Sequence, residues 1–226
     1  MKGRIPVYVE VTPKRTFAGA VEWPGWCRSG KTVDAALEAL VAYADRYGKV
    51  ISRSRLRFEA PSGVEDLEVV ERLKGNATTE FGAPGVPPKA DSRPLPPAEL
   101  KRQTAILEAS WRAFDRAVVA ARGVELTKGP RGGGRDVPKM ANHVFEAEEG
   151  YVGALGSRPP RLPGESLSQR EAALRRSAIA ALAALAAGKP LADPRNTKRP
   201  WSPRFYVRRS AWHALDHAWE IEDRSA

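Results

Sequence analysis

The sequence predicts an α+β N-terminal domain, with a small sheet and a helix, followed by an all-α antiparallel four-helix bundle. Three observations lead to this expectation. Short strand-like runs fill residues 1–75, proline and glycine crowd residues 76–98, and long helical periodicities fill residues 99–226. We therefore expect two domains joined by a linker at residues 76–98.

The first domain is expected to open with a hairpin, because two short apolar runs flank a turn-like TPKR segment. The segment PGWCRSGKT then predicts a loop, and residues 32–47 carry apolar side chains at helical spacing. The expected strands are residues 7–11, 17–23, 55–60 and 67–73. Proline and glycine in the linker predict that it forms neither a helix nor a central strand.

Four amphipathic segments follow the linker, and each carries signals for its ends. Asp136 and Ser202 are expected caps, each close to a proline that suits the first helical turn. Ser168 and Glu171 have capping-box spacing for the third helix. The expected helices are residues 100–121, 138–155, 168–187 and 203–223. Four helices of this length predict an antiparallel four-helix bundle.

Composition narrows the classes of function. The longest apolar run, residues 178–187, is about half the ~20 residues of a membrane-spanning helix, so no membrane partner is expected. A polar N-terminal segment and the single cysteine, Cys27, predict a cytoplasmic location. The net charge is +10, but the basic residues are spread over both halves without a basic tail, so nucleic acid is not expected as a partner.

All three histidines fall in the helical half, and their spacing predicts a common site. His213 and His217 are four residues apart, so their imidazoles project from one face of a helix. His143 shares an inward stripe with Met140 and Tyr151 on the second helix. A single inward histidine is more often a core residue with a hydrogen bond. Three together favour a metal site, with a nitrogen of each within ~5 Å of the others.

The helical half resembles the DinB/YfiT-like superfamily of metal-binding four-helix bundles. The resemblance rests on the closing segment RRSAWHALDHAWEIEDR and on ANHVFEAEEGYVGALG around His143. In that family one ligand lies on the second helix and two come from an HxxxH pair on the last helix. The resemblance therefore implies that His143, His213 and His217 are the metal ligands.

The N-terminal half resembles HicB-like domains through the segment FAGAVEWPGWCRSGKTVDAALEAL. Antitoxins of that family usually add a DNA-binding element, whereas this chain continues into the helical half. The resemblance leaves dimerisation, and thus a homodimer, or control of substrate access as the expected role of this domain.

Three imidazoles leave coordination positions open on Zn²⁺, Ni²⁺ or Fe²⁺, as in a catalytic metal site. Several DinB-like enzymes are thiol-dependent transferases or isomerases that use mycothiol, bacillithiol or glutathione, so the resemblance implies a thiol cofactor and a small-molecule substrate. A non-catalytic regulatory module is the alternative, distinguished by binding of a partner protein.

Charged residues near the histidines supply candidates for supporting roles. The acids could orient an imidazole or act as a general base, and Asp216 is the first choice for orienting one; the alternative is a solvated surface carboxylate. The basic residues could hold the carboxylate of a thiol cofactor or form a solvated face. The acids are Asp216, Glu220 and Glu146, and the basic residues are Arg204, Arg208 and Arg209, with Lys198 and Arg199 before them.

Three other features are expected to be structural. Trp212 and Trp219 are predicted packing anchors, and Cys27 is predicted to be inert because no histidine or acid lies near it in sequence. The PRGGGRD segment lacks the Lys-Ser/Thr ending of a phosphate-binding loop, which argues against nucleotide binding.

Overall fold

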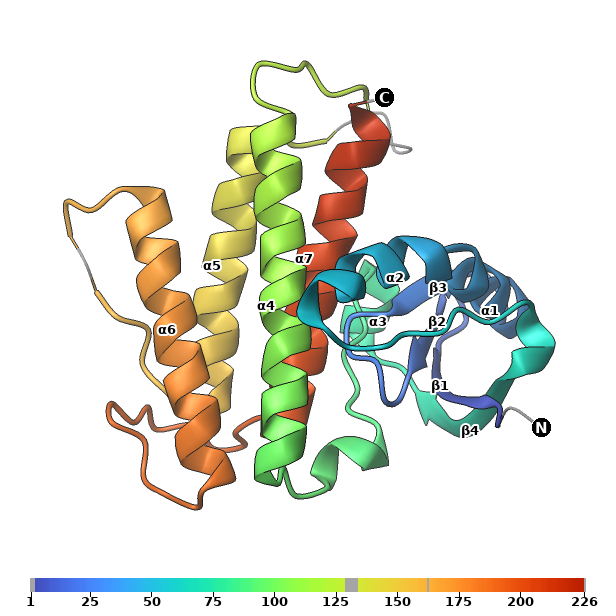
Figure 1. Ribbon diagram of the computed structural model, residues 1–226, viewed down its shortest axis with the longest axis horizontal. Coiled ribbons are helices and arrows are strands. Elements are labelled where there is room, and N and C mark those ends of the chain that lie inside the picture. Colours follow the sequence, from blue (N-terminus) through green and yellow to red (C-terminus); the bar gives the residue numbers. More distant parts are fainter. Residues whose placement is uncertain (1–2, 129–133, 162, 226) are drawn as a thin grey trace.

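A four-stranded sheet forms the first part of the chain, and helices follow it, so the fold is α+β (Figure 1). The computed structural model describes residues 3–128, 134–161 and 163–225. The strands are β1 (Ile5–Val11), β2 (Thr16–Ala20), β3 (Cys27–Gly30) and β4 (Leu67–Lys74). The strand order is β3-β2-β1-β4, in which β1 pairs antiparallel with β2 and parallel with β4.

The predicted hairpin is confirmed, but two other sequence predictions for this region are wrong. Cys27–Gly30 was expected in a loop and instead forms the edge strand beside β2. Residues 55–60 were expected as a strand and have no regular structure. Their apolar signal comes from Phe58, whose ring contacts the rings of Trp23, Trp26 and Tyr47.

Two helices, α1 (Val33–Ala42) and α2 (Ala44–Ile51), replace the single helix expected at residues 32–47. Thr32 caps α1 by accepting the N–H of Ala35, and the chain turns at Tyr43. The apolar faces of both helices share a buried cluster with the sheet. Within it, the Trp26 Nε1 donates to the carbonyl of Leu40 at 2.9 Å.

The linker contains a short α-helix, α3 (Ala77–Phe81), and a 3-10 helix at Lys89–Ser92, contrary to the expectation that it holds no helix. Helix α3 precedes the first proline of the segment, and Asn76 and Thr79 form its capping box. The linker is also held against the rest of the molecule. The buried Glu10 carboxylate accepts hydrogen bonds from the Thr79 hydroxyl and from the N–H groups of Gly85 and Val86.

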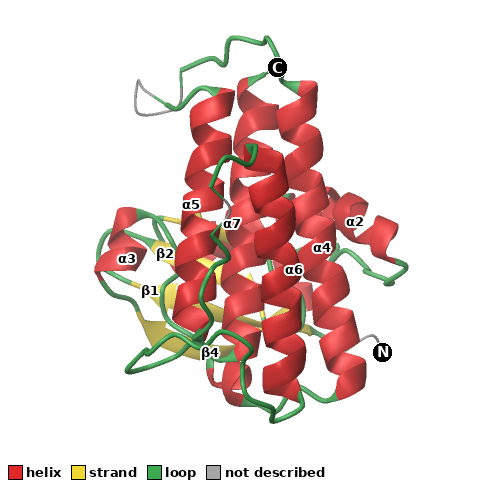
Figure 2. Ribbon diagram, turned by 90° about the vertical axis from the view of Figure 1, so that its left-hand side faces the viewer, coloured by secondary structure: helices red, strands yellow, loops and turns green. Residues whose placement is uncertain are grey.

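Four long helices lie side by side around an apolar core (Figures 1 and 2). They are α4 (Pro97–Ala120), α5 (Val137–Leu155), α6 (Leu167–Ala186) and α7 (Pro203–Arg224). Asp136 and Ser202 cap α5 and α7 as predicted. The third cap is Ser166, in a capping box with Gln169, rather than Ser168 with Glu171.

The directions of these helices differ from the expected antiparallel alternation. Figure 1 shows α4 and α7 running one way and α5 and α6 the other, because the chain after α5 returns along the side of the helices before α6 begins. A long crossover of this kind is one of the known ways to connect helices in bundles.

Helix α7 lies between the other long helices and the N-terminal sheet region. It contacts α4, α5 and α6, and its Leu215 and Trp219 belong to the apolar cluster of the sheet and α1. The α4 residues Ile106, Ala109 and Ala113 join the same cluster. The two sequence-defined halves therefore share a core, while the domain boundaries themselves stay a prediction. Within the described ranges, no helix has the length and apolar character needed to cross a membrane.

Candidate metal centre

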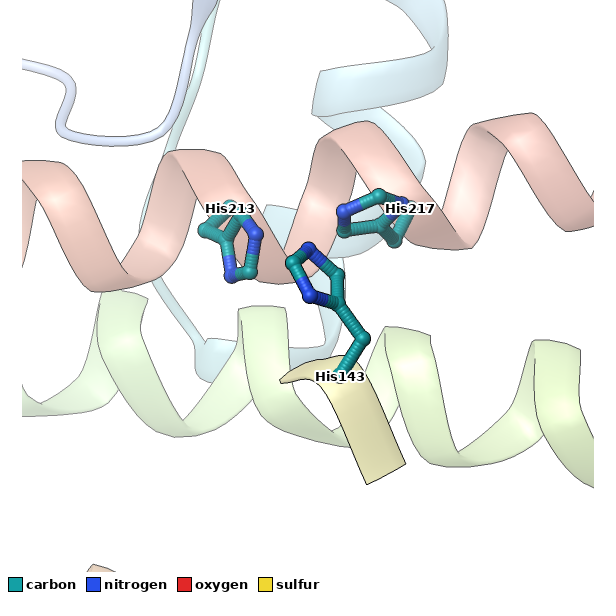
Figure 3. Close-up of side chains that lie close together, drawn as sticks. All are labelled: His143, His213 and His217. Carbon is teal, nitrogen blue, oxygen red and sulfur yellow. The ribbon is translucent and has the colours of Figure 1, made fainter. Parts of the chain in front are cut away.

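The three histidines meet between α5 and α7. His213 and His217 lie one turn apart on α7, and His143 reaches toward them from the facing side of α5 (Figure 3). The two helices run in opposite directions and contact each other along their length. The site is thus built on helices whose ends are fixed by the caps at Asp136 and Ser202.

The geometry is compact enough for one metal ion. One nitrogen from each of His143, His213 and His217 can be chosen so that all three lie within 4.8 Å of one another. The ring centroids of His143 lie 5.2 Å from those of His213 and 5.1 Å from those of His217, and the two α7 rings are 4.7 Å apart. The predicted convergence within about 5 Å is confirmed.

Burial favours the neutral form of two of the imidazoles, His143 and His213. Desolvation, and then repulsion from His217, lowers the pKa of His143 below its usual value of 6.5. The same two causes lower the pKa of His213 further, well below that value. Because only a neutral imidazole has a free lone pair for a metal, this environment favours metal binding over protonation.

Glu220 fixes the orientation of one imidazole. Its carboxylate lies 2.9 Å from the Nδ1 of His217, and this hydrogen bond lowers the pKa of Glu220. Since an ionised carboxylate only accepts hydrogen bonds, the neutral form of His217 carries its proton on Nδ1 here and keeps its lone pair on Nε2. Glu220 is held in turn by Arg224, whose Nη1 donates to it at 2.9 Å.

The residues present fit a divalent metal that prefers nitrogen ligands. The Nδ1 of His213 is buried and has no hydrogen-bond partner in the described part of the chain. Three imidazoles with one supporting carboxylate match the donor sets of Zn²⁺, Ni²⁺ and Fe²⁺ sites. A core role alone leaves this buried nitrogen without a partner, which is a cost that folded proteins generally avoid.

Two of the predicted acids pair with residues other than the histidines. Asp216 was the first choice for orienting an imidazole, but its carboxylate pairs with Arg28 of β3 at 2.9 Å. The reason is helical geometry, because Asp216 points to the sheet side of α7. Glu146 is exposed and accepts a hydrogen bond from Asn142. We call His143, His213 and His217 the histidine triad. Of the three predicted acids, only Glu220 forms a hydrogen bond with a histidine of this triad.

The structure separates the predicted basic residues. Arg204 binds the carbonyls of Arg93 and Pro94 and the carboxylate of Glu99, so it holds the linker to α4 and α7. Arg208 is buried in a bidentate pair with Asp91 and also donates to the carbonyls of Ala20 and Val21. These contacts occupy Arg208 within the fold, contrary to the cofactor role expected from sequence. Lys198 and Arg199 are exposed.

Arg209 lies near the histidines, beside two aromatic rings. Its guanidinium carbon is 5.3 Å from the ring centre of Tyr151 and 4.7 Å from that of Trp212. Tyr151 in turn lies 5.7 Å from the His213 ring, centre to centre. Of the basic residues proposed from sequence, Arg209 is the one positioned beside the triad.

Sequence reasoning missed Glu148, which forms a buried polar group between α5 and α7. Its carboxyl accepts hydrogen bonds from the hydroxyls of Tyr206 and Ser210, and burial raises its pKa. The spacing contains the signal, because Glu148 follows Ala141 and Val144 on the buried stripe of α5. These bonds fix how α5 sits on α7 and therefore how His143 meets its partners.

The predicted structural residues behave as expected. The Trp212 ring packs edge-on against Phe17, and Trp219 packs against Tyr43. Cys27 is buried, and burial raises the pKa of its thiol to about 12, so it is unreactive. Residues 130–133 of the PRGGGRD segment lie outside the described residues.

Comparisons of the chain with protein-family models, with curated proteins and with solved structures find no match.

Proposed function

We propose that this protein is a divalent-metal-dependent enzyme that uses an external thiol to attack a small electrophilic substrate. The observation that carries the proposal is the meeting of three imidazoles at one point between α5 and α7. Three protein ligands leave open positions on the ion, which is the arrangement of catalytic rather than structural sites.

The resemblance to DinB-like proteins supports the same conclusion. The residues that it implies as ligands, His143, His213 and His217, are the ones that approach one another. We also propose that the four long helices are a bundle of that type, and that the sheet region is a HicB-like domain that dimerises the protein or controls access to the site. The contact of Asp216 with Arg28, next to His217, supports a link between the sheet region and the metal site.

A bound divalent ion lowers the pKa of an incoming thiol, so that a thiolate forms near neutral pH. The three imidazoles would hold the ion, and Glu220 would keep His217 in the tautomer that presents Nε2. The thiol would lose its proton to solvent on binding. The sulfur then forms a bond to an electrophilic carbon of the substrate, and the electron pair displaced from that carbon takes up a proton from water.

The test begins with protein purified without an affinity tag, since added histidines recruit ions themselves. Metal analysis is expected to give about one divalent ion per chain. The loaded protein is then assayed with mycothiol, bacillithiol and glutathione against a panel of electrophiles. Thiol-dependent turnover that disappears on metal removal supports the enzyme. Loaded protein that shows no turnover but binds a specific partner protein would favour the regulatory module instead.

A further inference from the structure

Three arginines are buried among the described residues: Arg208, Arg209 and Arg224. Arg209 differs from the other two in what it contacts. Arg208 pairs with Asp91 and Arg224 with Glu220. The Nη1 of Arg209 is buried and has no hydrogen-bond partner in the described ranges, although the side chain is only 9% exposed. A buried charge without a counter-ion is costly, so this guanidinium is suited to an anionic partner that the described residues do not supply.

A second unpartnered donor lies beside it. The Nε1 of Trp212 is also buried without a hydrogen-bond partner among the described residues, and Arg209 stacks over the ring that carries it. Arginine and indole nitrogens can only donate hydrogen bonds. The buried acid of α5, Glu148, already accepts hydrogen bonds from Tyr206 and Ser210. The missing partner is therefore an acceptor, and beside a guanidinium it is an anion.

The position of these donors connects them to the histidines. Arg209 precedes His213 by four residues, about one helical turn or ~6 Å along α7. The Tyr151 ring contacts both residues, with its centre 5.3 Å from the guanidinium carbon and 5.7 Å from the imidazole centre. Tyr151 and His143 are only half buried, so they mark the side from which a small molecule reaches the triad.

We propose that Arg209, framed by Tyr151 and Trp212, binds the carboxylate of the small molecule that acts at the histidine triad. The ligand class is a short organic acid whose second functional group reaches the metal. The carboxylate could belong to the thiol or to the electrophile, and both use the same guanidinium. The role given to the ligand's second functional group rests on the proposed function. The contact between the carboxylate and Arg209 needs no metal.

Calorimetry with two thiols tests the proposal. Zinc-loaded protein is titrated with 3-mercaptopropionate, which has a carboxylate, and with 2-mercaptoethanol, which has none. We expect the first to bind at least tenfold more tightly, and Arg209→Met to remove that difference without changing zinc content. Arg112→Met removes an equal charge from a half-exposed position on α4 and should keep the wild-type preference. An Arg209→Met protein that still prefers 3-mercaptopropionate overturns the proposal.

A second readout separates a ligand site from a structural role. If Arg209 is an unpaired buried charge until an anion binds, the metal-free Arg209→Met protein should unfold at the same denaturant concentration as the wild type, or at a higher one. A variant that fails to fold shows that the side chain is structural. In that case Arg209→Gln, which keeps hydrogen-bond donors but loses the charge, replaces it in the calorimetry. If the proposal holds, Arg209→Gln loses the preference for 3-mercaptopropionate over 2-mercaptoethanol. A retained preference would show that the charge is irrelevant.

Failure of the thiol chemistry remains distinguishable from failure of the anion site. Metal-free protein is titrated with propionate, which has a carboxylate and no thiol. Binding by the wild type that is lost in Arg209→Met supports the anion site even if no thiol binds to loaded protein. The same propionate affinity in both proteins, or none in the wild type, counts against it. If the zinc-loaded protein binds propionate and 3-mercaptopropionate equally well, the thiol group adds nothing, which places the carboxylate on the electrophile rather than on the thiol.

Discussion

Glu220 and His217 face each other across one turn of α7, with the carboxylate 2.9 Å from the Nδ1 of the imidazole. The same carboxylate accepts a hydrogen bond from Arg224, which also donates to the carbonyls of Thr127 and Arg135. The orientation of a candidate ligand is therefore tied to two positions within the connection between α4 and α5.

Replacing Glu220 by Ala should weaken metal affinity by roughly 10–100-fold, because His217 loses the group that fixes its tautomer. Competition with a metal chelator measures the affinity. Asp216→Asn is the matched control, since that carboxylate pairs with Arg28 and leaves the imidazoles untouched. Equal metal affinity in Glu220→Ala and wild type would show that the hydrogen bond does not support a ligand.

Replacing His213 by Ala should abolish metal retention and thiol-dependent activity while leaving helical content largely intact. The apolar positions of α7, such as Ala211, Ala214 and Ala218, remain in place, and the change removes a buried nitrogen without a partner. Metal analysis and circular dichroism measure the two effects. Asn142→Ala, on the exposed face of α5 next to His143, should retain the metal. Retention of a full metal complement in His213→Ala would contradict the assigned ligand set.

Lowering the pH should destabilise the metal-free protein through His213. Its folded-state pKa lies well below the usual 6.5, so below pH 6.5 the unfolded chain binds a proton that the folded chain does not. Stability is thus fully present above that pH and is lost at up to about 1.4 kcal/mol per pH unit as pH falls toward the folded pKa. Urea titrations at several pH values measure this slope, which should be smaller in His213→Ala. Identical slopes in the two proteins would mean that another group controls the acid sensitivity.

Replacing Asp91 by Ala should cost about 3–5 kcal/mol of unfolding free energy, because it leaves the buried Arg208 without its carboxylate. Removing both charges, with Asp91→Leu and Arg208→Met, should restore part of the loss. Chemical denaturation measures both proteins.

Limited proteolysis should cut residues 76–98 first, as the linker hypothesis expects, and much faster in Asp91→Ala than in wild type. A wild-type cleavage rate in that variant would show that the pair does not hold the linker.

Much of the helical half follows from local sequence signals. The caps at Asp136 and Ser202 and the stripes on α5 and α7 depend on residues a few positions apart, and these same stripes brought the three histidines together. No comparable local pattern in the sequence predicts that the connection between α5 and α6 runs back along the helices. Helix direction depends on how a long connection packs, so the antiparallel expectation was wrong for α5 and α6.

The supporting residues were harder to foresee for a related reason. Asp216 and Glu220 both lie within four residues of a triad histidine, and sequence spacing does not show which carboxylate pairs with a residue elsewhere in the fold. Arg28, which is distant in the sequence, forms an ion pair with Asp216, whereas Glu220 forms a hydrogen bond with His217. Asp91 similarly occupies Arg208 and leaves Arg209 beside the triad.

The embedding of α7 determines how the molecule can be dissected experimentally. A fragment that begins at residue 99 keeps all three histidines but uncovers Leu215, Trp219 and the α4 residues that the sheet region covers. It also strips Asp91 from Arg208. Such a fragment should aggregate, even though every candidate ligand is present. Recombinant work on the metal centre therefore needs the sheet region on the same polypeptide, or supplied in trans.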